Sequence, residues 1–517
     1  MRPAAIGIIA LALIVGAGVP AAQTPAAGAP PRLTVHGDPP DPTNVSDELK
    51  KIYAAIDGDF DAHVERLRKW ARIPNISNTV EGEPGVWASA TFLRDLIVKE
   101  LGCQAEVRAP GISEWGAPSH PIVYGRCDVG AEKTVLDYIQ ADVMPVWREV
   151  EKWPLPPFGG EMVAKPPFRK VMYGRGVNNQ KGKEMAQLNA LIAIKKVTGT
   201  LPVNVIFLAD HDEERMELGP RTFMMAHPDL FKDADVAFGY AGSQRADGYG
   251  EIAGQSIGTV AFELQTSGIR PGRGLGQQPM ARHMKMLASL YGNDEDGDVL
   301  AIKGISDGAL PPSPEEREYL RQEAAHAKRP FEEVLQERTA VRVGITGTWG
   351  GNMVPGPHAG NITPVVATSK VDIRFPPGIE GEQIVERVRA HLKANGYEDV
   401  KLTVIGIVPW SWANADNEMG SAIKQMYRQF NVPFIEPPKG NYMGTWTAYG
   451  PPYLFTRGPL QIPHLRGGLG YGNGAHLTTE GEYYVIEGDG QRIYGFAGAM
   501  KSAATVLYNY AGMGATR

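Results

Sequence analysis

Apolar residues recur at regular intervals along most of the chain. Residues 47–73 and 91–101 place them at helical spacing, which predicts two amphipathic helices. Three short apolar runs have strand character, and a helical stretch separates the last two of them. The runs cover residues 121–129, 135–143 and 203–208, and the helical stretch covers residues 181–197. Strands that alternate with helices predict an α/β fold, with a doubly wound, mostly parallel sheet.

The middle of the chain, residues 258–407, has a different order of elements. Strand-like segments are predicted at 260–265, 369–375 and 402–408, and helical segments at 279–291, 314–338 and 382–395. This β-α-β-like order predicts a smaller α+β lid domain inserted into the first domain. Residues 47–257 and 408–517 then form the two parts of that first, catalytic-type domain.

The N-terminal residues are typical of a signal peptide. Arg2 supplies a positive charge, residues 6–15 form a short apolar run, and Val19-Pro20-Ala21 is a cleavage site of small residues. The run is too short for a membrane anchor. We therefore expect residues 1–22 to be removed, residues 23–46 to be a disordered mature N-terminus, and the protein to be periplasmic or secreted.

Composition excludes several classes of function. The chain has 517 residues, of which 43% are hydrophobic and 21% charged, with a net charge of -6. No basic cluster with interleaved aromatic residues is present, which argues against a nucleic-acid partner. The two cysteines, Cys103 and Cys127, are too few for a zinc site built from cysteine. Whether they pair in an oxidising compartment is left open by the sequence.

Four polar stretches are candidates for chemistry. Two of them follow predicted strands, and ligands of open α/β sheets bind outside the carboxyl ends of the strands. Taken singly, such stretches are more often turns, solvated loops or structural histidines than sites. Their order along the chain makes a shared site the better interpretation. The stretches are residues 140–145, 173–182, 210–214 and 472–476.

This order resembles the dinuclear zinc exopeptidases that include carnosinase, glutamate carboxypeptidase, acetylornithine deacetylase and succinyl-diaminopimelate desuccinylase. That family reads His-x-Asp-Val-x-Pro, Gly-Arg-Gly-x-x-Asp-x-Lys-Gly, Glu-Glu and a late Ala-His. Residues 201–204, 371–374 and 484–488 extend the match. The resemblance implies hydrolysis of amide bonds in small peptides or N-acyl amino acids, a zinc cofactor, and a homodimer formed through the lid.

The resemblance also assigns roles to five residues that are present here. Glu213 matches the general base, and Asp142 matches the residue that orients the first metal ligand. Glu214 and His476 match two metal ligands. Arg374 matches a position that grips a substrate carboxylate, a task that suits a guanidinium group.

Other ligand positions depart from the family pattern. The first ligand, a histidine, is Gln140, and the aspartate that bridges the metals is Asn179. The acidic ligand falls near Tyr240 and Ala241, where no acid stands, and the lid histidine falls loosely at Gly274. Zinc prefers imidazole, thiolate or carboxylate to an amide oxygen.

The missing bridge has the largest consequence. Two divalent ions roughly 3.5 Å apart repel by about 19 kcal/mol at an effective dielectric of about 20, and an anionic bridge offsets much of this. Because Asn179 is neutral, the sequence argues against two zinc ions. One metal held by Glu214, His476 and an acid such as Asp210 or Asp212 stays open, and so does no metal.

The replacements nevertheless keep the polarity of the cleft. Gln140 and Asn179 are expected to hydrogen-bond a polar substrate, and the adjacent carboxyls of Glu213 and Glu214 to raise one another's pKa. Either Glu213 transfers protons, or both glutamates are solvated and inert. Three functions follow: an exported amide hydrolase with a reduced zinc site, a metal-independent enzyme on the same scaffold, or a non-catalytic protein that binds a small peptide or amino-acid derivative.

Overall fold

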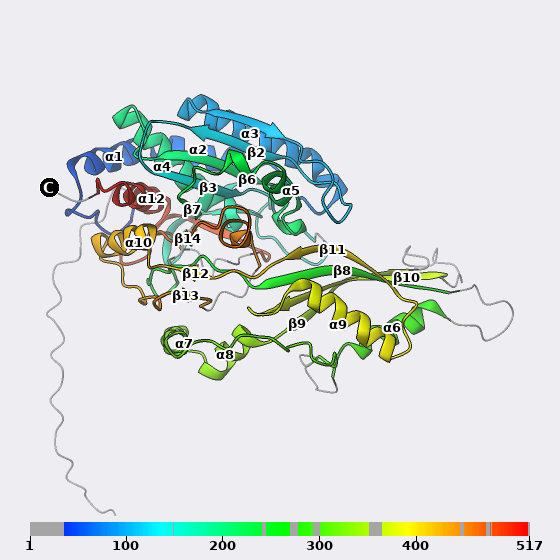
Figure 1. Ribbon diagram of the computed structural model, residues 1–517. Coiled ribbons are helices and arrows are strands. Elements are labelled where there is room, and N and C mark those ends of the chain that lie inside the picture. The colour runs from blue at the N-terminus through cyan, green and yellow to red at the C-terminus, as the bar shows by residue number, and fades with distance from the viewer. Residues whose placement is uncertain are drawn as a thin grey trace, which may run out of the picture.

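A computed structural model describes residues 36–147, 149–239, 244–268, 278–292, 300–350, 364–444, 449–471, 476 and 478–514. The helix-covered main sheet and a second, antiparallel sheet form the two bodies visible in Figure 1. Within the described ranges, no helix is both long and apolar enough to cross a membrane.

The main sheet has six strands in the order β1-β2-β6-β3-β7-β14. The pairs from β6 through β3 and β7 to β14 are parallel, whereas β1 and β2 join antiparallel at one edge. This mixed, mostly parallel sheet confirms the predicted fold class. The strands are β1 (Gln104–Arg108), β2 (Ile122–Cys127), β3 (Thr134–Gln140), β6 (Asn204–Asp210), β7 (Val236–Gly239) and β14 (His464–Arg466).

Helices cover both faces of this sheet. Val135 and Ile139 of β3 pack on one face, and Leu136 and Tyr138 pack on the other, as the strand period of two requires. The first face is covered by α1 (Asp47–Gly58), α2 (Phe60–Ala71), α3 (Glu83–Leu101), α4 (Gly182–Thr198), α10 (Glu418–Gln429) and α12 (Phe496–Tyr510). The second is covered by α5 (Leu218–Ala226) and α11 (Pro452–Thr456).

The second sheet is antiparallel, in the order β11-β8-β10-β9. Its strands are β8 (Gly258–Ser267), β9 (Arg342–Gly350), β10 (Val366–Phe375) and β11 (Lys401–Val408). Helices α6 (Pro279–Ser289) and α9 (Gly381–Ala394) share its apolar core. Helices α7 (Pro314–Ala327) and α8 (Phe331–Thr339) lie apart from them in Figure 1. The separate sheet confirms the expected lid domain.

A small three-stranded sheet joins distant parts of the chain beside the main sheet. It contains β4 (Glu161–Lys165), β5 (Phe168–Tyr173) and β15 (Tyr483–Glu487), with β5 in the centre. The pairing of β15 with β5 brings residues 483–487 next to the start of the polar stretch 173–182. The remaining short elements are β12 (Ala413–Asn414), β13 (Asn441–Tyr442), η1 (Val80–Gly82), η2 (Val177–Lys181), η3 (Glu213–Arg215) and η4 (Pro228–Leu230).

Two predicted helices are each divided in two. The helix expected over residues 47–73 is α1 and α2, because Gly58 ends the first and Asp59 leaves the helical conformation with φ -101° and ψ 13°. The block expected over residues 314–338 is α7 and α8. Lys328 adopts a left-handed φ of 54° there, and Pro330 cannot continue a helix that precedes it.

Part of the predicted disordered N-terminus is packed in the structure. The Asp38 carboxylate accepts hydrogen bonds from the backbone N–H groups of Gly488, Gly495 and Gly498. Lys501 of α12 forms an ion pair with Asp41. These long-range partners hold residues 36–46, so the expectation of disorder is wrong for them. The predicted signal peptide and residues 23–35 lie outside the described residues.

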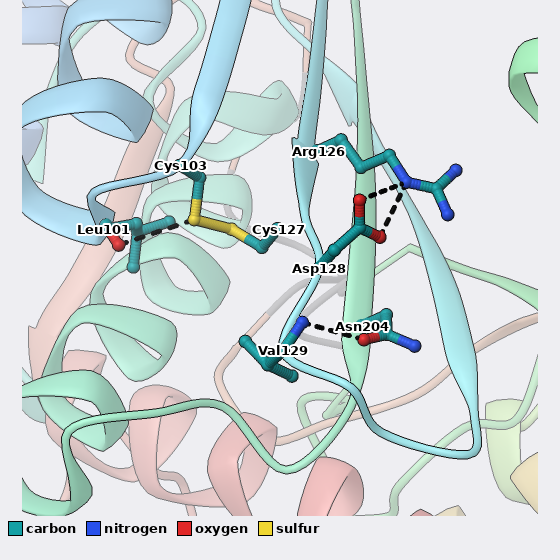
Figure 2. The surroundings of a disulfide bond; sticks show 7 residues. All are labelled: Leu101, Cys103, Arg126, Cys127, Asp128, Val129 and Asn204. Atoms are coloured by element: carbon teal, nitrogen blue, oxygen red, sulfur yellow. Dashed lines mark hydrogen bonds and ion pairs between the residues drawn. A yellow bond between two sulfur atoms is a disulfide. The ribbon is translucent and has the colours of Figure 1, made fainter.

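The two cysteines form a disulfide, which answers the question that the sequence left open. Cys103 precedes β1, Cys127 ends β2, and their Cα atoms are 5.0 Å apart. Figure 2 shows this corner, where Asn204 also accepts a hydrogen bond from the Val129 N–H at 2.9 Å. The bond therefore ties the antiparallel edge of the main sheet to the chain that follows α3.

Candidate active site

The candidate site lies at the carboxyl edge of the main sheet. Gln140 and Asp210 are paired at the ends of the parallel strands β3 and β6. The Ala141 N–H donates to the Asp210 carbonyl at 2.8 Å and continues the pairing beyond the strands. As the sequence predicted, the stretches that begin at Gln140 and at Asp210 therefore meet in space.

Asp142 holds the two adjacent glutamates in position. Its Oδ1 accepts a hydrogen bond from the Glu213 N–H at 3.2 Å, and its Oδ2 accepts one from the Glu214 N–H at 3.1 Å. The Ser77 hydroxyl donates to Oδ2 at 2.5 Å. Burial raises the pKa of Asp142 to about 6, although these donors oppose the rise. Asp142 is thus a positioning residue that acts through the backbone of the Glu213–Glu214 turn.

The surroundings of Glu213 favour its neutral form. Burial raises its pKa well above the usual range, and the charges of Glu214 and Asp142 raise it further. The Arg466 charge and a hydrogen bond with the Gln140 side chain oppose this. Burial likewise raises the pKa of Glu214 to about 8. The expected effect of Glu214 on Glu213 is therefore present.

The lid contributes a cation to the site. Arg374 on β10 has a side chain that is 39% exposed, with its Nε 3.4 Å from Asp372 Oδ2. Its guanidinium carbon lies 5.7 Å from the ring centroid of Tyr449, whose hydroxyl donates to the Glu213 carbonyl at 3.3 Å. The Arg374 charge also lowers the pKa of Glu214. Arg374 therefore faces the glutamates while remaining accessible to a ligand.

Asn179 is held by a glutamate that sequence reasoning missed. The buried carboxylate of Glu482 accepts backbone hydrogen bonds from Gly176, Asn178 and Asn179, and it pairs with Arg175. The Asn179 side-chain oxygen accepts a hydrogen bond from Gln180 at 2.8 Å. The sequence around Glu482 does not distinguish it from an exposed acid, because the turn that its carboxylate holds lies about 300 residues earlier in the chain.

His476 is not joined to the glutamates in the described part of the chain. Its side chain is exposed, its ring centroid lies 6.0 Å from that of Tyr483, and no hydrogen bond or ion pair links it to Glu213 or Glu214 there. Its role as a ligand therefore stays a prediction. Gly472 to Ala475, Tyr240, Ala241 and Gly274 lie outside the described residues.

The nearby aspartates are occupied by protein donors. Asp210 accepts hydrogen bonds from the Tyr138 hydroxyl at 2.5 Å and the Asp212 N–H at 2.6 Å. Asp212 pairs with Arg215 at 2.8 Å. The described residues include no group of three or more His, Cys, Asp or Glu side chains placed to hold a metal. With neutral amides at Gln140 and Asn179, they do not fit the zinc pair implied by the resemblance.

Three further charged residues at this edge were missed by the sequence reasoning. Glu184 on α4 is buried, and its Oε1 accepts from the Gln140 N–H at 3.4 Å. Glu217 is fully buried, and neither of its carboxylate oxygens has a hydrogen-bond partner among the residues that the structure describes. Arg466 ends β14 and acts electrostatically on both glutamates. Their relevance depends on strand order, which no local sequence signal reveals.

Comparison with known families decides the relationship. The family model described as Peptidase family M20/M25/M40 matches residues 140–449. The chain belongs to this family. The Cys-Gly metallodipeptidase DUG1 of Candida albicans is 25% identical over 381 residues, covering 66% of this chain and 75% of that protein. The human Beta-Ala-His dipeptidase is 26% identical over 418 residues, covering 74% of this chain and 79% of that protein.

Solved structures share the fold of this M20-family chain. The di-peptidase Dug1p from Saccharomyces cerevisiae superposes with a TM-score of 0.72 at 21% identity, covering 90% of this chain and 98% of that one. Human carnosine dipeptidase 1 gives a TM-score of 0.72 at 19% identity, covering 90% of this chain and 100% of that one. At these identities the comparison shows a shared fold, and the shared fold covers both domains.

Proposed function

We propose that this protein is an exported hydrolase of the amide bond in a small peptide or N-acyl amino acid, with Glu213 as general acid and base. The observation that carries the proposal is the placement of Glu213. Its backbone is fixed by Asp142, its side chain meets Gln140, and its pKa is raised by burial. A carboxyl with a raised pKa exchanges protons readily near neutral pH.

The reaction needs one proton to be carried between two atoms. The ionised form of Glu213, which the Arg466 charge and the Gln140 hydrogen bond favour, takes a proton from water as the water oxygen bonds to the substrate carbonyl carbon. The tetrahedral intermediate then collapses, the carbon–nitrogen bond breaks, and Glu213 returns the proton to the leaving amine. Gln140 and Asn179 hydrogen-bond polar groups of the substrate in this proposal, and Asp142 keeps the Glu213 backbone in place.

Arg374 supports a substrate that carries a free carboxylate. Its partly exposed guanidinium faces the site from the lid, and such a group binds a carboxylate through two parallel hydrogen bonds. The related proteins named for Cys-Gly and β-Ala-His are dipeptidases, and dipeptides have this carboxylate. We therefore propose dipeptides as the first substrates to test, and a homodimer as the assembly to look for.

The zinc site is reduced or absent in this proposal. Its support is the donor chemistry of Gln140 and Asn179 and the exposed position of His476. Elemental analysis of the purified protein before and after dialysis against chelator measures this directly. At most one tightly held equivalent of metal is the expected result, and turnover that persists in chelator would favour the metal-independent alternative. Two tightly held equivalents would contradict it.

Export is proposed from two independent features. The first 22 residues have the composition of a signal peptide, and Cys103 and Cys127 are disulfide-bonded. Disulfides persist in oxidising compartments and are rare in the cytosol. Fractionation of the source cells with N-terminal sequencing should find a mature chain in the periplasm or the medium. A cytosolic chain that retains its first 22 residues would contradict export.

Glu213→Gln tests the catalytic proposal. The amide is close in size to the carboxyl but cannot carry the proton, so hydrolysis of Cys-Gly or β-Ala-His dipeptide should fall by about 10²–10⁴-fold. Glu398→Gln, the same substitution at an exposed lid position, is the matched control and should leave turnover unchanged. Unchanged turnover in Glu213→Gln would remove Glu213 from the mechanism. Dipeptide binding without any turnover would favour the non-catalytic alternative.

A further inference from the structure

The carboxyl edge of the main sheet gathers buried and half-buried acids. Glu213 and Glu217 come from the segment after β6, and Glu184 comes from the first turn of α4. The two side chains that differ most from the family pattern there, Gln140 and Asn179, carry no charge. Buried carboxyls next to one another are stabilised by a positive charge, so the source of that charge matters for what the site does.

Arg466 is placed by the backbone to supply this charge. It is the last residue of β14 and is in register with Gly239, the last residue of β7. Its backbone exchanges two hydrogen bonds with Ala253, Arg466 N–H to Ala253 carbonyl at 2.5 Å and the reverse at 3.1 Å. A rigid backbone of this kind directs the side chain from a fixed point at the carboxyl edge.

Gly239 lies beside the Arg466 side chain. A Cβ atom on Gly239 would lie 3.7 Å from the Arg466 Nε, so the guanidinium end passes alongside the glycine. Because β7 is the neighbour of β3 in the sheet, this path leads toward the end of β3, where Gln140 lies. The side chain is partly exposed, which leaves room for a ligand to contact it.

The electrostatic effects of Arg466 converge from separate segments. Its charge lowers the pKa of Glu213, of Glu217 and of Glu184. It also lowers the pKa of Lys183, which adjoins Glu184 on α4. These effects agree with the path beside Gly239, which puts the guanidinium at the carboxyl edge of the sheet. A substrate carbonyl attacked by a water on Glu213 would lie at the same edge.

We infer that the Arg466 guanidinium binds the carbonyl oxygen of the scissile amide and stabilises the oxyanion that forms when water adds to the carbonyl carbon. This inference rests on the proposed amide hydrolysis and names the group that polarises the bond. A fixed donor aimed at developing charge acts mainly on the transition state. As the tetrahedral intermediate collapses, the oxyanion electrons re-form the carbonyl, the amine leaves with the proton from Glu213, and Arg466 remains charged throughout.

Arg374 and Arg466 then have separate tasks. Arg374 reaches the site from the lid strand β10 and would bind the free carboxylate of the substrate, which has the same charge before and during the reaction. Arg466 stands on the main sheet and would bind an oxygen that is charged only during the reaction. Loss of Arg374 should therefore mainly raise KM, and loss of Arg466 should mainly lower kcat.

The test uses a tetrahedral anion that does not depend on turnover. A phosphinic isostere of the β-Ala-His dipeptide is titrated by calorimetry into the full mature protein and into Arg466→Gln, Arg466→Lys and Arg126→Gln. Arg126 is the matched control, since it is a partly exposed arginine on β2 that pairs with Asp128 and Asp233 away from the site. Hydrolysis of the β-Ala-His dipeptide is measured in parallel, and thermal unfolding checks that each variant is folded.

The expected result is a 30- to 300-fold weaker affinity of Arg466→Gln for the phosphinic isostere, with a similar loss in kcat and a KM within about threefold. Arg466→Lys should recover part of both losses, because it keeps the charge but not the planar fork. Arg126→Gln should match the wild type. Arg466→Gln that binds the isostere as tightly as wild type, or that retains full kcat, overturns the assignment.

The two proposals fail in different ways. If wild type hydrolyses no dipeptide while isostere binding still depends on Arg466, amide hydrolysis is wrong and the anion-binding role of Arg466 stands. If wild type hydrolyses the dipeptide and Arg466→Gln does so equally well, amide hydrolysis stands and the role of Arg466 is wrong. If Arg466→Gln fails to fold, the Arg466→Lys variant decides: wild-type affinity and kcat despite loss of the fork would overturn the oxyanion assignment.

Discussion

Two buried glutamates near the candidate site are held in opposite ways. Glu482 is fully buried, and its carboxylate accepts three backbone N–H groups while pairing with Arg175. Glu217 is equally buried, yet in the described part of the chain neither of its oxygens has a hydrogen-bond partner. The backbone of Glu217 also adopts a left-handed φ of 58°.

The contrast is between a buried carboxylate that stabilises the fold through hydrogen bonds and one that does not. Native proteins satisfy buried polar groups almost everywhere, and an exception calls for a physical explanation. Glu482 organises the turn that carries Asn179, so its environment is complete without a ligand. Glu217 lies on the Glu213 side, where its carboxylate has no hydrogen-bond partner among the described residues and the charges of Arg466 and Arg221 act on it instead. The carboxylate of Glu482 is thus satisfied by protein groups, whereas that of Glu217 is not satisfied by the described ones.

The largest effect on stability is expected at Glu482. Glu482→Gln would leave Arg175 with a neutral neighbour and one amide N–H₂ facing backbone donors, so unfolding in urea should show a loss of about 3–5 kcal/mol. Glu151, which also pairs with Arg175, supplies the comparison, and Glu151→Gln should lose less because Glu151 is partly exposed. A Glu482→Gln variant as stable as the wild type would show that its hydrogen bonds are not structural.

A smaller loss of stability is expected at Asp38, a second well-bonded carboxylate remote from the site. Asp38→Ala leaves the N–H groups of Gly488, Gly495 and Gly498 without their acceptor, and unfolding should show a loss of about 1–3 kcal/mol. Turnover per folded molecule should not change. Altered turnover in a folded Asp38→Ala protein would mean that bonding pattern does not separate structural from functional acids.

The smallest effect is expected at Glu217, and it depends on pH. Burial raises its folded-state pKa well above the value in the unfolded chain, so the native protein keeps the proton and loses stability as pH rises above about 4.5. Glu217→Gln removes this dependence. The variant should gain about 1–2 kcal/mol on the wild type between pH 5 and pH 7, because only the wild type must release or keep a proton there. The cost of burying an unpaired amide is the same at both pH values and does not change this gain.

Urea unfolding of both proteins between pH 5 and pH 8 measures this difference. A stability difference that stays constant with pH, or that favours the wild type more as pH rises, would show that the pKa of Glu217 is not raised. The contrast between the two sides of the site would then disappear.

Part of the site was predictable because its residues follow strands. Gln140 and Asp210 end apolar runs, and parallel strands bring their carboxyl ends to one edge, so their meeting followed from the pattern alone. The role of Asp142 was predictable only in part. Its nearness to Glu213 follows from the same edge, but its two backbone hydrogen bonds depend on the shape of the η3 turn.

The fold class was determined by the sequence itself. Alternating strand and helix periods specify a doubly wound sheet, and the change of order at residue 258 marks the inserted lid, because periodicity is a local property that each segment carries alone. Only the tertiary structure decided which charges meet. Strand order places Arg466 at the same sheet edge as Glu213 and Glu184, and β15 brings Glu482 to a turn about 300 residues away. Electrostatic fields and desolvation depend on distances in space, which no local pattern contains.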